Sequence, residues 1–162
     1  MVVRLLDIQP APDAFAAVMA TGIVSVAAED HHVRWLSVSL AVVGTLAFVV
    51  ISLIIAVRTV VLKRFPFDMQ NPDVLVRLFT FVAACAVLGA RLEAHHAEIW
   101  TFAVLAWLAW LVLAPMAVRT MWRYRWTGLR DRAHGVWELT SIAPSGLAIL
   151  TAQLVLLTRS RA

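Results

Sequence analysis

No charged side chain occurs in three long stretches of the chain, Trp35–Val57, Ile99–Val118 and Leu139–Thr158. A helix that crosses a bilayer needs about 20 predominantly apolar residues, and each stretch reaches or approaches that length. The chain is 62% hydrophobic and 15% charged, whereas a soluble domain has about 25% charged residues. A soluble all-α core is therefore the weaker alternative, and the sequence predicts an all-α integral membrane protein.

Two further apolar segments bring the expected membrane-spanning helices to five. The first follows Pro10 and Pro12, which suit the entry to a helix. The second is free of charge only between Arg77 and Arg91. We expect one transmembrane domain over residues 1–162, with spans at about 14–28, 35–62, 74–92, 99–118 and 136–158.

A cleavable signal peptide is the alternative for the first segment, because residues 26–28 (Val-Ala-Ala) resemble a small-residue cleavage site. An export signal has a positively charged leader. Here Asp7 and Asp13 offset Arg4. We therefore expect the first segment to remain as a span.

The Lys and Arg residues are distributed unequally between the two ends of the expected spans. Nine of the 14 lie in the N-terminal segment and in the loops after the second and fourth spans, and four lie on the opposite side. Cytoplasmic loops are enriched in Lys and Arg, so we expect a multi-pass protein of the cell (plasma or inner) membrane, with the N-terminus cytoplasmic and the C-terminus outside. The net charge of +4 is explained in this way, and no nucleic-acid partner is expected. The tryptophans near span ends are Trp35, Trp100, Trp122, Trp126 and Trp137.

The odd-numbered and even-numbered spans differ in composition. The second and fourth are apolar around their whole circumference, whereas the first, third and fifth carry small and polar residues. Small residues let helices approach closely, and hydroxyls in hydrocarbon need a partner or water. We therefore expect about two and a half helical hairpins, with the odd helices inside and the even helices facing lipid. On the first span, the small face consists of Ala17, Thr21, Ser25 and Ala28, with Gly22 beside it.

An anion that crosses a low-dielectric layer needs positive potential at the mouths of its path and dipoles between them. Arg77 and Arg91 bracket the third span and are expected to supply the charge, with snorkelling of Arg77 or an ion pair with Glu138 as the alternative. Pro144 has no N–H and should kink the fifth span. Close packing of small residues without any path is the alternative for the whole arrangement. The expected path residues are Thr21, Gly22, Ser25, Arg77, Thr80, Arg91, Ser141, Pro144 and Ser145.

Three of the spans resemble those of a known family. Residues 15–25 (Phe-Ala-Ala-Val-Met-Ala-Thr-Gly-Ile-Val-Ser) resemble the first-helix signature of the tellurite-resistance/dicarboxylate transporter family, which includes malate permeases, sulfite permeases and slow anion channels. Residues 79–89 are similar to its third helix, and 137–138 with 145–150 are similar to its fifth. The resemblance implies ten helices in five hairpins around one pore, with odd helices inside. It also implies transport of small anions such as C4-dicarboxylates, sulfite or tellurite-like ions.

The resemblance extends to the N-terminal half of the family fold. We therefore expect half of a ten-helix transporter, which encloses a pore only with a further copy of itself or a second half-transporter chain. The ninth helix of the family, which supplies a gating phenylalanine in channel members, has no counterpart here, and no phenylalanine is given that role. A truncated, non-transporting remnant, or an accessory subunit that packs with other membrane helices, is the alternative.

The sequence does not predict an enzyme, because it has no nucleophile–base pairing, no phosphate-binding glycine loop and no CxxC motif. No catalytic residue and no cofactor are expected. Two acidic–histidine clusters, at 29–32 and 93–98, lack strict ligand spacing, so no metal site is expected. The single Cys85 excludes an intrachain disulfide. The expected partners are small anions, membrane lipid and a further copy or second chain.

Overall fold

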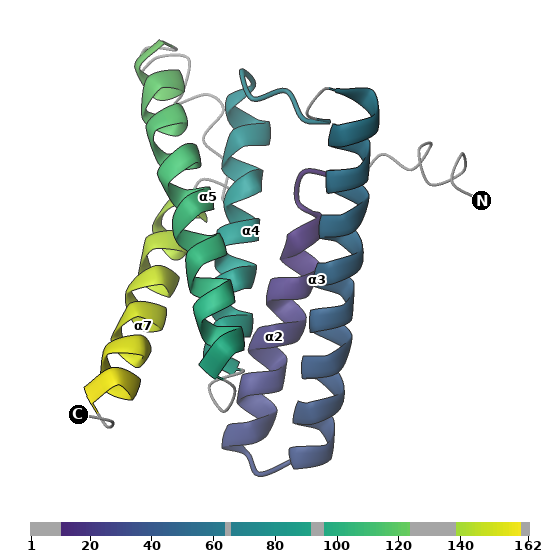
Figure 1. Ribbon diagram of the computed structural model, residues 1–162, viewed down its shortest axis with the longest axis vertical. Helices are drawn as coiled ribbons and strands as arrows, with labels where there is room; N and C mark the ends of the chain where they lie inside the picture. Colours follow the sequence, from purple (N-terminus) through teal and green to yellow (C-terminus); the bar gives the residue numbers. More distant parts are fainter. Residues whose placement is uncertain (1–10, 64–65, 92–95, 124–138, 160–162) are drawn as a thin grey trace.

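The computed structural model describes residues 11–63, 66–91, 96–123 and 139–159 of the chain. All regular secondary structure in these residues is helical (Figure 1). This confirms the predicted all-helical class. The five helices are α2 (Ala14–Asp30), α3 (Arg34–Leu62), α4 (Pro72–Arg91), α5 (His96–Arg123) and α7 (Leu139–Arg159).

Three of the described helices are long and apolar enough to cross a membrane: α3, α4 and the part of α5 from Ile99 to Arg123. α2 is shorter, with 17 residues, and so is the apolar part of α7, Ser141–Leu156. Membrane crossing by α2 and α7 therefore stays a prediction. α5 continues to Arg123, beyond the expected end at 118, because a helix does not have to stop where the charge-free stretch ends.

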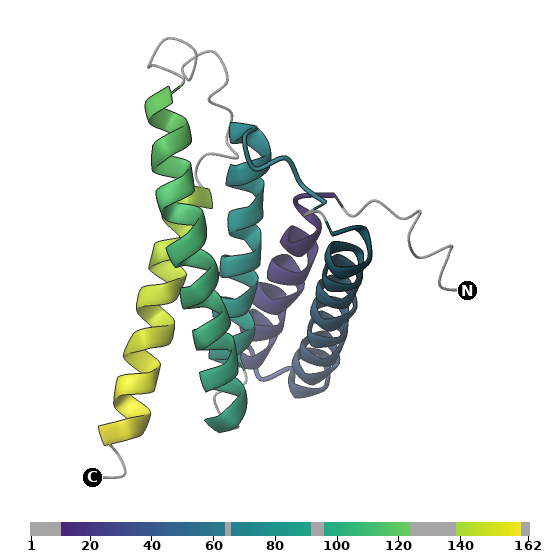
Figure 2. The same cartoon turned by 45° about the horizontal axis from the view of Figure 1, so that its top comes forward.

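Local chemistry accounts for several helix ends. Residues 31–33 form a short turn between α2 and α3, in which the Val33 N–H donates to the Ala28 carbonyl at 2.8 Å. α4 begins at Pro72, which lacks the N–H that would be unpaired in a first turn, and ends at Arg91, a cation at the negative end of the helix dipole. The short turn makes α2 and α3 antiparallel neighbours (Figure 1, Figure 2).

α4 is the central helix of the bundle. It packs against α2, α3, α5 and α7. In the most apolar segment of α4, 67% of the residues are buried. The corresponding shares are 11% for α3 and 28% for α5. α2 and α3 lie on one flank of α4, and α5 and α7 lie on the other (Figure 1, Figure 2). Small residues on α4 allow this close packing on several sides: Ala83, Ala84, Cys85, Ala86 and Gly89.

A cluster of four phenylalanines, one from each of four helices, fills the interior beside α4. The ring of Phe81 on α4 lies 4.9 Å from Phe15 on α2 and 5.4 Å from Phe48 on α3, centroid to centroid. Phe48 also lies 5.4 Å from Phe102 on α5. Edge-to-face and offset-stacked pairs of this kind add about 0.5–1.5 kcal/mol each to area burial, so the cluster fixes how the four helices meet.

The surfaces of α3 and α5 carry large apolar side chains that a soluble protein would bury. Leu46 and Leu53 on α3 are each 60% exposed, and Leu108 on α5 is 57% exposed. An apolar surface of this extent favours contact with lipid. Trp35 and Trp122 lie near helix ends and are also exposed, which is where membrane interfaces enrich tryptophan. The exposed side chains thus support a membrane protein.

Two glycines offer a matched test of the close helix packing. A Cβ atom on Gly146 would lie 2.9 Å from the Ala86 Cβ, which cannot rotate away. A Cβ atom on Gly44 would meet its nearest side-chain atoms, on Leu88 and Thr21, at an ordinary 3.6 Å. Gly146→Ala should push α7 away from α4 and destabilise the fold by about 1–3 kcal/mol. Gly44→Ala should be neutral or stabilise by up to about 1 kcal/mol, because alanine favours the helix.

The measurement is thermal denaturation of both variants in the same detergent, followed by circular dichroism. A lower melting temperature for Gly146→Ala alone is the expected outcome. If Gly146→Ala melts like the unsubstituted protein, α4 and α7 do not approach each other as closely as described.

Candidate functional site

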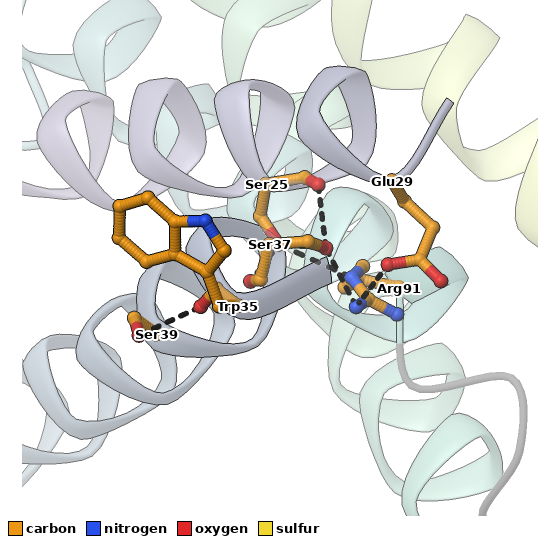
Figure 3. Close-up of polar contacts among 6 residues, drawn as sticks. All are labelled: Ser25, Glu29, Trp35, Ser37, Ser39 and Arg91. Carbon is orange, nitrogen blue, oxygen red and sulfur yellow. Dashed lines mark hydrogen bonds and ion pairs between the residues drawn. The ribbon is translucent and has the colours of Figure 1, made fainter. Parts of the chain in front are cut away.

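A buried polar cluster joins α2, α3 and α4 close to the α2–α3 turn (Figure 3). Ser25 on α2 and Ser37 on α3 are both 0% exposed. The Ser25 Oγ donates to the Ser37 carbonyl oxygen, and the Ser37 Oγ donates to the Ser25 carbonyl oxygen, each at 2.8 Å. This reciprocal pair satisfies two hydroxyl donors that an apolar interior would otherwise leave without a partner.

Arg91, the last residue of α4, completes the cluster (Figure 3). Its Nε donates to the Ser25 Oγ at 3.1 Å and its Nη2 donates to the Ser37 Oγ at 2.7 Å. Nη2 also lies 3.2 Å from the Glu29 Oε2. The Arg91 side chain is 20% exposed, so these charge-assisted bonds compensate for the water it has lost. One guanidinium therefore holds three helices together, and Glu29 balances its charge.

Part of the small-residue face of α2 lies against α3, whereas Ala17 on that face is exposed. The Thr21 Cγ2 is 3.6 Å from the position that a Cβ on Gly44 would take, Ser25 is fully buried, and Ala28 is 7% exposed. Gly22, beside this face, is buried at the contact with α4. Close packing between α2 and its neighbours thus accounts for Thr21, Gly22, Ser25 and Ala28. Their role in a transport path stays a prediction.

Arg77 lies near the opposite end of α4. Its Nη1 is 2.8 Å from the Oδ2 of Asp13, the residue that precedes α2, and the two side chains are 40% and 42% exposed. An ion pair with this exposure adds little stability. Thr80, one turn further along α4, is 1% exposed and donates its hydroxyl to the Arg77 carbonyl at 2.7 Å. Glu138, the partner considered for Arg77 from the sequence, lies outside the described residues.

Three of the expected path hydroxyls donate their protons within their own helices. Thr21, Thr80 and Ser145 each bond to a carbonyl oxygen about one turn earlier, at 2.7–2.8 Å. A hydroxyl bonded in this way offers an anion no proton until it rotates away from its carbonyl. Direct contact between an anion and these groups therefore costs a local hydrogen bond.

The expected path residues of α7 are on its exposed surface. Ser141, Pro144 and Ser145 are all exposed, and α7 is one helix from Leu139 to Arg159 with Pro144 inside it. The structure therefore divides the expected residues among different places. Ser25 and Arg91 share the polar cluster, Arg77 and Thr80 lie near the start of α4, Thr21 and Gly22 lie in the contacts of α2, and Ser141, Pro144 and Ser145 lie on α7.

Sequence analysis did not identify Ser37 or Asp13 as partners. Ser25 and Ser37 are equally distant from residue 31 in the α2–α3 turn, so an antiparallel hairpin with that turn brings them face to face. This symmetry can be recognised in a sequence once the turn is placed. Asp13 gives no comparable signal, because its partner Arg77 is 64 residues away.

Metal ligands do not gather in the part of the chain that the structure describes. No group of three or more His, Cys, Asp or Glu side chains there is arranged to hold a metal ion. His31 and His32 in the α2–α3 turn are exposed. Residues 93–95 of the second acidic–histidine cluster lie outside the described residues.

A comparison with protein families finds a match for nearly the whole chain. A model of the voltage-dependent anion channel family matches residues 10–161. The chain belongs to this family. Membership confirms the resemblance of the first, third and fifth segments to a family of anion transporters that includes the slow anion channels. Members of the family are channels and transporters rather than enzymes. Comparisons with curated proteins and with solved structures found no match.

Family membership makes the polar cluster worth testing in its own right, since it joins three helices of an anion-channel fold. Ser37→Ala removes a donor to Ser25 and an acceptor for Arg91, so it should destabilise the protein by about 1–2 kcal/mol. Ser39→Ala is the matched control, because the exposed Ser39 Oγ bonds only to the Trp35 carbonyl of its own helix (Figure 3). Thermal denaturation in detergent measures both.

A double-mutant cycle with Arg91→Met separates the hydrogen bond from the loss of the hydroxyl itself. Coupling between Ser37→Ala and Arg91→Met is expected, and none between Ser39→Ala and Arg91→Met. Purely additive effects for the first pair would contradict the cluster.

Proposed function

We propose that the chain forms part of a path by which small anions cross a cell membrane. The observation that carries this proposal is the family match over residues 10–161. The substrate classes that we propose are C4-dicarboxylates, sulfite and tellurite-like oxyanions, following the resemblance of the first, third and fifth segments. We also propose that all five helices cross the membrane, with the N-terminus cytoplasmic and the C-terminus outside.

Burial supports a division into inner and outer helices. α3 and α5 expose most of their apolar surface, whereas α4 is largely buried. We propose that α2, α4 and α7 are the inner helices and that residues 1–162 form half of a ten-helix transporter, which a further copy or a second chain completes. The exposed hydroxyls of Ser141 and Ser145 on α7 support this, because they are polar groups on a mostly apolar helix.

The charges at the two ends of α4 suit a path that attracts anions without trapping them. Arg77 is paired with Asp13 and Arg91 with Glu29, so neither end presents an uncompensated cation. An anion must leave a path as readily as it enters, which a strong fixed charge prevents. We propose Arg77, the more exposed of the two, as the charge at the mouth, and Arg91 as a residue that positions α2 and α3 around α4.

A non-transporting accessory subunit is the second candidate. One observation favours it: thirteen of the 20 residues of α4 are buried, which leaves this helix little free surface for a path. Anion efflux from liposomes that contain the purified protein distinguishes the two functions. Efflux above that of empty vesicles supports transport. A protein that melts cooperatively and gives no efflux, alone or with a second half-transporter chain, supports the accessory role.

Two opposite substitutions test the charge at the mouth. Arg77→Gln should lower anion flux by roughly threefold to tenfold at about 10 mM salt and much less at about 150 mM, because salt screens a charge that acts at a distance. Asp13→Asn should raise flux under the same low-salt conditions, because it removes the carboxylate that balances Arg77. Equal changes at both salt concentrations would indicate a folding defect and would contradict an electrostatic role.

A further inference from the structure

An apolar groove of about 780 Å³ lies between α3 and α5. Its volume is within the range of about 300–1,000 Å³ that holds a drug-sized ligand. Phe81 of α4 and Phe15 of α2 form part of its lining, as do Ile55, Phe67 and Met116 from the α3 and α5 sides. The lining is apolar apart from the hydroxyls of Ser52 and Thr59. A groove with such an apolar lining favours the binding of a hydrocarbon chain.

The groove opens on the side where α3 and α5 face outward. Leu105, Leu108 and Val112 line it and are 38%, 57% and 56% exposed. The same helices carry the apolar surface that supports a membrane location. In a bilayer no water is present to fill such a groove, and an apolar cavity excludes water in any case. The occupant therefore comes from the surrounding hydrocarbon.

Positive charge marks one end of the groove. α3 and α5 run in the same direction, so both end on the same side of the bundle (Figure 1). Arg119 and Arg123 follow the lining residue Met116 by three and seven positions within α5, so both lie on the continuation of its groove-lining face. Lys63 ends α3 in a left-handed backbone conformation and does not continue the face of that helix. Lys63 and Arg119 are both exposed. Arg123 adds a third exposed cation one turn beyond Arg119.

Carboxylates at this end of the bundle offset part of the positive charge. Asp68 is exposed in the connection between α3 and α4, and its Oδ1 accepts a hydrogen bond from the Gln70 N–H. Asp73 and the Asp13–Arg77 ion pair also lie at this end of the bundle, as does the buried Arg58. The described residues there thus include five cations and three carboxylates, which leaves this end positive. Hydrocarbon along the groove and positive charge at its end together match one ligand chemistry, an acyl chain attached to an anionic headgroup.

The geometry points to a binding site for an anionic phospholipid, with one acyl chain in the groove between α3 and α5 and the phosphate near Arg119 and Arg123 at the end of α5. The groove lining includes none of the proposed path residues, so the site goes beyond anion transport and does not depend on it. It also gives the basic end of α5 a specific role, in addition to the general preference of cytoplasmic loops for Lys and Arg.

Native mass spectrometry of the full chain in detergent tests the site, with phosphatidylglycerol and phosphatidylcholine of the same acyl chains added separately. Preferential retention of phosphatidylglycerol is expected. Arg119→Gln or Arg123→Gln should each weaken retention by about fivefold, since one cation near anionic lipid contributes that much. Arg34→Gln is the control, because it removes a cation at the opposite end of α3. Equal retention of the two lipids, or an equal loss in Arg34→Gln, would overturn the headgroup assignment.

A groove-filling substitution tests the acyl chain independently of charge. Ala56 lines the groove, so Ala56→Trp should abolish most phosphatidylglycerol retention. Val50→Trp is the control, because Val50 is 54% exposed on α3 outside the groove. Unchanged retention in Ala56→Trp would overturn the site. So would efficient dimer formation by a bifunctional thiol reagent at Leu108→Cys, which would show that a second copy covers the groove; the native Cys85 is fully buried and does not interfere.

Discussion

The arrangement of the described helices depends on one constraint: a polar group inside an apolar bundle must find its partner within the protein. Ser25 and Ser37 meet this requirement by bonding to each other's carbonyl oxygens, and Arg91 meets it by bonding to both hydroxyls. Each of these bonds joins different helices. Because none can form unless the helices take one register, a few polar atoms fix an arrangement that apolar packing alone would leave free to slide.

The same need for a partner applies to the two arginines that could attract an anion. The two arginines that bracket α4 look like a pair of attractive charges in the sequence, but each has a carboxylate beside it in the structure. Arg77 is exposed and weakly paired, whereas Arg91 is partly buried and bonded to three side chains. Two residues of one type thus have different physical roles. The difference comes from their surroundings rather than from their positions along α4.

Most of the helices could be predicted from the sequence, but the faces by which they contact one another could not. Charge-free stretches locate α3, α5 and α7, because lipid excludes charge over the length of a span. Such stretches do not mark helix ends, and α5 therefore extends to Arg123. The small face of α2 predicts a path, with packing as the alternative, since both favour alanine, glycine and serine. Only the contacts of Thr21 and Ser25 with α3 show where that face lies.

The partners of Arg91 have a consequence for synthesis of the protein. Ser25, Glu29 and Ser37 all precede Arg91 in the chain, and the two serines already bond to each other across the α2–α3 hairpin. The α2–α3 hairpin can therefore form with those groups satisfied, before α4 leaves the ribosome. The polar atoms of Arg91 find no such partners within α4, because its guanidinium bonds to acceptors that the α2–α3 hairpin supplies. The contacts of Arg91 with α2 and α3 therefore form on a hairpin whose own hydrogen bonds need no part of α4.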